Sequence, residues 1–172
     1  MDTAAELTTL VVIFGGQSAE HDVSCTTAVH VLRAENPQHY RTTAIGISRD
    51  GRWFHPSLPR LPHGGIDTDS LPDRLEATGV ATSPEVLFQE HADNAMVVFP
   101  LIHGPLGEDG TLQGLLEMTG LPYVGSGVLA CATAMDKAVA KTLFTSAGLP
   151  QVKYRVVREG TITDATIDDI VH

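Results

Sequence analysis

The sequence has little cysteine and few basic residues, and each scarcity argues against a class of protein. Among 172 residues, Cys25 and Cys131 are the two cysteines and have no CxxC spacing, so we expect two small buried thiols in a reducing compartment rather than a disulfide framework. Lysine and arginine total 11 against 21 acidic residues, and the formal charge of −10 disfavours nucleic acid or an anionic membrane surface as a partner.

The sequence also lacks an evident targeting or membrane segment. Residues 1–10 contain no basic stretch, and the apolar run that follows them is too short to span a membrane, so we expect a cytoplasmic protein. The hydrophobic content of 42% is enough for a packed core, in one domain or in one domain and the beginning of a second.

The apolar pattern predicts alternating strands and helices. The runs at residues 7–14, 40–48 and 95–101 are predicted strands, because they are apolar or alternating and stop near glycine or polar residues. Apolar side chains recur with helical spacing in residues 25–32 and 112–116. This order indicates an α/β fold, a Rossmann-like open and mostly parallel sheet flanked by helices.

The other segments are less regular. Residues 55–94 are rich in proline and glycine, which predicts a long surface excursion with one short strand at residues 86–88. Residues 151–157 alternate apolar and polar side chains and are predicted to form a strand. We expect residues 1–135 to form one domain and residues 136–172 to begin another.

Two glycine-containing loops follow predicted neighbouring strands. The first loop starts at Gly15-Gly16 and contains Glu20, and the second loop, Gly104 to Gly110, follows His103 and contains Glu108. Neither loop is a GxGxxG motif or has the lysine of a P-loop, which disfavours a dinucleotide site. Carboxylates beside a histidine suit a small cationic or zwitterionic molecule, whose ammonium group pairs with a carboxylate in a dry site.

Structural alternatives are open for every candidate residue. Glu20 and Asp22 also suit the positive end of a helix dipole, and Asp109 suits a helix cap. A histidine at the end of an apolar strand, such as His103, is also typical of a hydrogen-bonded structural residue. Lys137 is consistent with a solvated helix face as well as with a phosphate contact.

Three motifs in this order resemble the D-alanine:D-alanine ligases of the ATP-grasp group. They are VVIFGGQSAEHDVS at residues 11–24, FPLIHGPLGEDGTLQGLLEMTGLPYVGSGVLACATAMDK at residues 99–137, and LFTSAGLP at residues 143–150. The resemblance implies an ATP-dependent ligase that joins two D-alanines through an acyl phosphate for peptidoglycan synthesis. It also implies a cytoplasmic homodimer that uses ATP and Mg²⁺.

The resemblance assigns roles to four residues. Glu20 corresponds to the catalytic glutamate that pairs with the ammonium group of the first D-alanine. His103 corresponds to the catalytic histidine next to that substrate's carboxylate, with Gly104 lining the same pocket, and Lys137 corresponds to a lysine that faces nucleotide phosphates.

The resemblance covers only part of the family's length. The family's Mg²⁺-binding carboxylates and its charge-stabilising arginine find no counterpart in the sequence, so we expect no metal ligand here and no catalysis by this chain alone. Residues 1–135 then correspond to the amino-terminal substrate domain and residues 136–172 to the beginning of the ATP-grasp domain. The alternative from another class is a non-catalytic binding or dimerisation module with a Rossmann-like fold.

Overall fold

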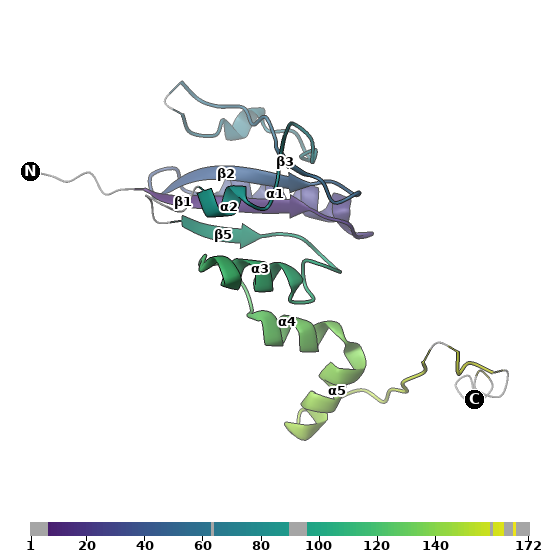
Figure 1. The fold of residues 1–172 in the computed structure, drawn as a ribbon. Coiled ribbons are helices and arrows are strands. Elements are labelled where there is room, and N and C mark those ends of the chain that lie inside the picture. The colour runs from purple at the N-terminus through teal and green to yellow at the C-terminus, as the bar shows by residue number, and fades with distance from the viewer. Residues whose placement is uncertain (1–6, 63, 90–95, 159, 164–166, 168–172) are drawn as a thin grey trace, which may run out of the picture. The chain divides into compact units, whose positions relative to one another are not determined.

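The computed structural model describes residues 7–62, 64–89, 96–158, 160–163 and 167, and the chain divides into two compact units, Met1–Met135 and Asp136–His172. The first unit contains a five-stranded sheet with the order β4-β3-β2-β1-β5 (Figure 1). The long strand β1 pairs in parallel with β2 and β5, whereas β3 pairs with β2 and β4 in antiparallel. The predicted open α/β sheet is confirmed. The strands are β1 (Thr8–Gly15), β2 (Tyr40–Ile47), β3 (Trp53–His55), β4 (Val80–Thr82) and β5 (Met96–Pro100).

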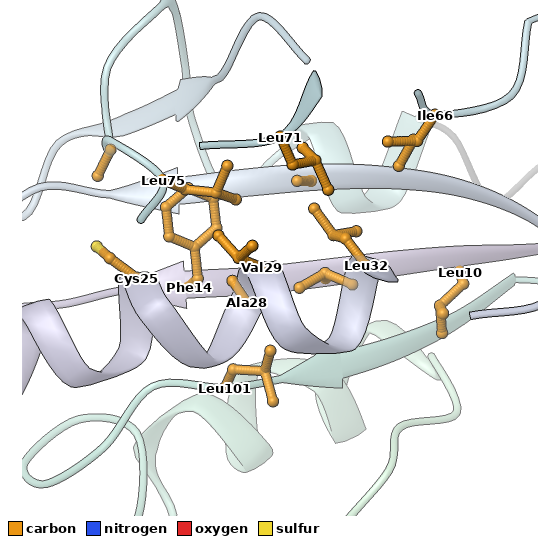
Figure 2. Close-up of a cluster of buried hydrophobic side chains, with 13 residues drawn as sticks. Leu10, Phe14, Cys25, Ala28, Val29, Leu32, Ile66, Leu71, Leu75 and Leu101 are labelled. Atoms are coloured by element: carbon orange, nitrogen blue, oxygen red, sulfur yellow. The ribbon is translucent and has the colours of Figure 1, made fainter. Parts of the chain in front are cut away.

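One face of the sheet is covered by α1 (His21–Ala34), as the apolar spacing of residues 25–32 predicts. In Figure 2, Cys25, Val29 and Leu32 of this helix gather near Phe14 of β1. Phe14 is fully buried, because β1 has neighbouring strands on both sides and packing on both faces. This layer therefore fixes the end of β1 at which the first loop begins.

The opposite face carries a second buried cluster. It joins Val11 and Ile13 of β1 to Leu87 of α2 (Val86–Gln89) and to Leu112 and Leu116 of α3 (Thr111–Thr119). Helix α3 ends at Gly120, whose φ is 70°. Glycine is favoured at this position because it adopts the left-handed conformation that closes a helix without steric cost. The unit continues to α4 (Val128–Met135) and also contains a short 3₁₀ helix, Thr68–Ser70.

The prediction for residues 55–94 was wrong in two respects. The segment is no mere surface excursion, since Leu71 and Leu75 enter the same buried cluster as α1 (Figure 2). Its strand is β4, at the edge of the sheet, and residues 86–88 lie in α2 rather than in a strand. Pro84 explains the helical turn, because its fixed φ favours the start of a helix and its carbonyl accepts the amide of Leu87 at 3.1 Å.

The second unit contains α5 (Lys137–Ser146), which starts at a side-chain cap. Asp136 Oδ1 accepts hydrogen bonds from the amides of Ala138 at 2.9 Å and Val139 at 3.1 Å. Residues 151–158, all of them described, form no strand, which corrects the prediction for residues 151–157. A strand needs a partner, and the described part of this unit contains no other strand.

Two further expectations concern the thiols and the membrane. Cys25 is buried as expected, but Cys131 is partly exposed, and both are free thiols. Across the described ranges, none of the helices has both the length and the apolar character that crossing a bilayer requires.

Candidate functional site

The candidate site lies at the carboxyl ends of β1 and β5. These two strands are parallel neighbours, so the loops that follow them leave the same edge of the sheet (Figure 1). The amide of Gly16 bonds to Ile47 O at 2.7 Å and the amide of Leu101 bonds to Ile13 O at 2.7 Å. Both loops therefore start from backbone that is held in the sheet.

The first loop needs glycine because its backbone is left-handed and crowded. Gly15 and Gly16 have φ values of 90° and 97°. A Cβ on Gly15 would lie 2.2 Å from Ile47 O, and one on Gly16 would lie 2.6 Å from Ile102 Cγ2. Side chains at these two positions would collide with Ile47 and Ile102, so only glycine allows the chain to turn here. The turn leads to α1, and Glu20 is the residue directly before that helix.

Glu20 and Asp22 differ in their partners although both stand at the start of α1. The Asp22 carboxylate pairs with Arg49 Nη2 at 2.9 Å and with Arg74 Nη1 at 3.3 Å. Glu20 occupies the N-cap position and is exposed, but its side chain neither caps the helix nor pairs with a cation among the described residues. Asp22 therefore joins three chain segments, whereas the Glu20 carboxylate is available to a ligand.

The second loop brings its backbone against Glu20. Gly104 has a φ of 73°, and a Cβ at this position would lie 3.2 Å from Glu20 Oε2 and 3.2 Å from Ser18 Cβ. Ser18 in turn holds the first loop, since its Oγ accepts the amide of Glu20 at 3.2 Å. The structure thus brings together Glu20 and Gly104, which the sequence places more than eighty positions apart.

His103 is half-buried beside this contact. Its Nδ1 lies 3.8 Å from Glu108 Oε1, and its Nε2 is buried without a hydrogen-bond partner in the described part of the chain. A buried polar atom without a partner is costly and therefore marks a position where a ligand or water can bind. Glu108 also accepts the amide of Gly104 through Oε2 at 2.7 Å, so this carboxylate shapes the loop around His103.

Asp109 has a structural role in the second loop. Its carboxylate accepts the amides of Leu106 at 2.9 Å and Thr111 at 3.0 Å, so it holds the turn before α3. The N-cap position itself is Gly110 and, among the described residues, no side chain caps the helix, which corrects the expectation that Asp109 is the cap. Burial opposes ionisation of Asp109, but these hydrogen bonds outweigh it and keep the pKa of the carboxyl below its ordinary value. Leu106 has a φ of 68°, an unusual conformation for a residue with a side chain that these bonds help to hold.

Sequence reasoning missed the residue that connects the two loops. Ser24 is fully buried, and its Oγ accepts the amide of Gly15 at 2.8 Å and donates to Leu101 O at 2.6 Å. The available signal was a hydroxyl on the buried face of the predicted helix, four residues before Ala28. Another missed residue, Gln113, is buried in α3, and its side-chain amide donates a hydrogen bond to Gly107 O at 2.8 Å, which joins the second loop to α3.

Two cavities of the described chain are lined by neither Glu20 nor His103. A cavity of about 1020 Å³ lies at the opposite ends of β1 and β2, near Glu35 and Arg60. A small apolar cavity of about 170 Å³ lies behind the first loop, between Trp53 and Ile102. We place the candidate site at the loops rather than in either cavity, because the Glu20 carboxylate lies against Gly104 there and the preceding residue, His103, has a buried Nε2 without a partner in the described part of the chain.

Lys137 belongs to the second unit, where it is exposed at the first residue of α5. Its predicted contact with phosphates stays a prediction. Within the described ranges, no three side chains of histidine, cysteine, aspartate or glutamate cluster as a metal site would require.

Comparisons with known proteins concern the family of the chain rather than the roles of single residues. A family model described as the D-ala D-ala ligase N-terminus matches residues 9–126. The chain is 46% identical to a D-alanine–D-alanine ligase of Staphylococcus carnosus over 84% of this chain and 40% of that protein, and 43% identical to one of Listeria welshimeri over 88% and 43%. The solved D-alanine–D-alanine ligase of Coxiella burnetii superposes with a TM-score of 0.72 at 28% identity, over 97% of this chain and 49% of that one. The chain therefore spans less than half the length of these relatives.

Proposed function

Because this chain belongs to the D-alanine–D-alanine ligase family and matches its N-terminal part, we propose that it forms the wall of an active site that binds the first D-alanine. The whole protein would be a cytoplasmic, ATP-dependent ligase that makes D-alanyl-D-alanine for peptidoglycan. One observation carries the proposal: the carboxylate of Glu20 has no partner among the described residues and lies against Gly104, next to His103.

The chemistry of D-alanine fits these groups. Its ammonium group needs a negative partner, which Glu20 supplies, and its carboxylate needs a hydrogen-bond donor, which a ring N–H group of His103 supplies. Binding at both ends orients the amino acid, and orientation lowers the barrier of a reaction at its carboxylate. Gly104 admits the substrate because it presents no side chain to the space beside Glu20.

The rest of the reaction needs groups besides those of the loops. ATP with Mg²⁺ supplies the γ-phosphoryl group that activates the carboxylate of the first D-alanine. Lys137 fits a phosphate contact, since it is cationic and exposed, and we assign it that role. We assign no magnesium ligand to this chain. The homodimer that the family resemblance implies stays a prediction.

The substitution Glu20→Gln tests the proposal, because it removes the charge and keeps the size of the side chain. We expect this variant to bind D-alanine at least about ten-fold more weakly than the wild type in a titration followed by NMR, since charged hydrogen bonds contribute about 1.5–3 kcal/mol. L-alanine serves as the ligand control and should bind less well than D-alanine.

Asp22→Asn is the matched control, two residues away on the same helix. It removes an equal charge that is already paired with Arg49 and Arg74, so D-alanine affinity should change by less than about two-fold. An unchanged affinity in Glu20→Gln, or an equal loss in both variants, would show that Glu20 does not pair with the ammonium group.

A further inference from the structure

We propose that Ser24 is a positioning residue that sets the spacing between the two loops, and with it the spacing between Glu20 and His103. The inference rests on the function proposed above, because it concerns the same substrate site. It extends that function to a residue that would touch neither D-alanine nor ATP.

A single hydroxyl makes the connection. Ser24 Oγ accepts one hydrogen bond from the Gly15 amide and donates one to Leu101 O, at 2.8 Å and 2.6 Å. The residue is 0% exposed, so water cannot replace either bond without entering the core. Ser24 and Leu101 are 77 positions apart in the chain, and the bond therefore fixes a long-range distance rather than a local turn.

Short, stiff connections lead from this hydroxyl to both candidate residues. Glu20 lies one helical turn before Ser24, and its carbonyl accepts the Ser24 amide at 3.0 Å. His103 lies two residues after Leu101, on backbone that has just left β5. A displacement at Ser24 would therefore move the carboxylate and the imidazole relative to each other, which changes the fit of a ligand that contacts both.

Two backbone-anchored bonds also brace this edge. The register of β1 and β5 ends at Ile13 and Pro100, and one further bond joins the Leu101 amide to Ile13 O, but it does not involve α1. His21 braces the first loop through Nδ1, which donates to Gly16 O at 2.8 Å, but this bond does not reach the second loop. Among the hydrogen bonds of the described residues, those of Ser24 thus connect α1 both to the first loop at Gly15 and to the start of the second loop at Leu101.

The substitution Ser24→Ala tests the inference, because it removes the hydroxyl and leaves the helix intact. We expect D-alanine affinity, measured by NMR titration of this chain, to fall about ten-fold. Ser24→Thr keeps the hydroxyl and should bind D-alanine more tightly than Ser24→Ala, despite an added methyl group in a closely packed site.

Two control variants separate positioning from a general loss of stability. Val29→Ala removes buried volume from the same face of α1, which lowers stability without touching the loops, and Thr27→Ala removes a hydroxyl that bonds within the helix to Val23 O. Both should bind D-alanine within about two-fold of the wild type. Equal losses of affinity in Ser24→Ala and Val29→Ala would overturn the positioning role.

A second measurement decides the inference even if the proposed function fails. If the wild type does not bind D-alanine, the substrate assignment is wrong, but the loop connection is still visible in the ¹H–¹³C signal of the His103 ring and in hydrogen exchange of the Gly15 amide. Ser24→Ala should shift the ring signal and accelerate the exchange, and Val29→Ala should leave the ring signal in place. A ring signal that is unchanged in Ser24→Ala would overturn the inference.

Discussion

The contact between Gly104 and Glu20 makes a quantitative prediction. An alanine at position 104 must adopt a φ near 73°, a left-handed conformation that costs a residue with a side chain about 1–2 kcal/mol. Its Cβ would also lie 3.2 Å from Glu20 Oε2 and 3.2 Å from Ser18 Cβ, and the second distance is shorter than the optimum of about 3.5–4.0 Å between carbon atoms. Since Glu20 is exposed, its carboxylate can retreat by a few tenths of an ångström, which costs little stability but misplaces the charge for D-alanine.

Gly120 provides a matched control for this substitution. It has a φ of 70°, and a Cβ there would meet no atom within 4 Å, so Gly120→Ala has the same backbone cost without the contact. We expect both variants to lose about 1–2 kcal/mol in the free energy of unfolding, measured by denaturant titration. Only Gly104→Ala should bind D-alanine more weakly, by about three- to ten-fold, because small misplacements of a binding group are costly.

Two outcomes would refute this reasoning. If Gly104→Ala binds D-alanine as the wild type does while showing the expected loss of stability, the second loop does not adjoin the substrate. If Gly104→Ala loses much more stability than Gly120→Ala, the first loop at Ser18 and Glu20 cannot move away from the new Cβ, and the two loops are held together more tightly than the exposure of Glu20 indicates.

Two further predictions concern titratable groups. Asp109→Asn should lower the free energy of unfolding by about 0.5–1.5 kcal/mol at pH 7, because the side-chain NH₂ group replaces one of the two oxygens that accept the Leu106 and Thr111 amides. The pKa of Asp109 is depressed in the folded wild type, so the ionised carboxylate stabilises the fold above pH 3.8, the ordinary pKa of the carboxyl. As the pH falls below that value, the free energies of unfolding of the wild type and of Asp109→Asn should converge in denaturant titrations. Burial, with smaller effects of nearby carboxylates, raises the pKa of the Cys25 thiol to about 11, so a thiol reagent at pH 8 should label Cys131 and spare Cys25 in the folded protein. The same raised pKa predicts that stability falls as the pH rises from 9 toward 11, because only the unfolded thiol ionises there; labelling of both thiols at equal rates would contradict the burial of Cys25.

A strand of the sheet could be predicted wherever the apolar pattern of its sequence matches the burial of its side chains in the fold. Residues 10–14 form a continuous apolar run because this part of β1 is buried on both faces, so the run was a sufficient signal. The same reasoning fails for Leu71 and Leu75. They are buried through isolated side chains in irregular backbone, and such positions have no period that a pattern could show.

The residues of the candidate site could be named from the sequence, but their contacts could not. The sequence places Glu20 and Asp22 two positions apart at a helix start, and nothing local distinguishes them. The difference comes from Arg49 and Arg74, which reach Asp22 from other segments of the fold. Ser24 was missed for the same reason, since its second partner, Leu101, comes from a distant strand.

The bond between Ser24 and Leu101 also has a consequence for the order of folding. Strands β1 and β2 with α1 are close in sequence, whereas the pairing of β1 with β5 must first close a loop of about eighty residues, which costs more chain entropy. We expect the β1–α1–β2 unit to form first and the second loop to arrive last. During synthesis on the ribosome, we expect Glu20 to reach its position in the β1–α1–β2 unit before the segment around residue 104 has left the exit tunnel, so the candidate site would be completed only after that segment emerges.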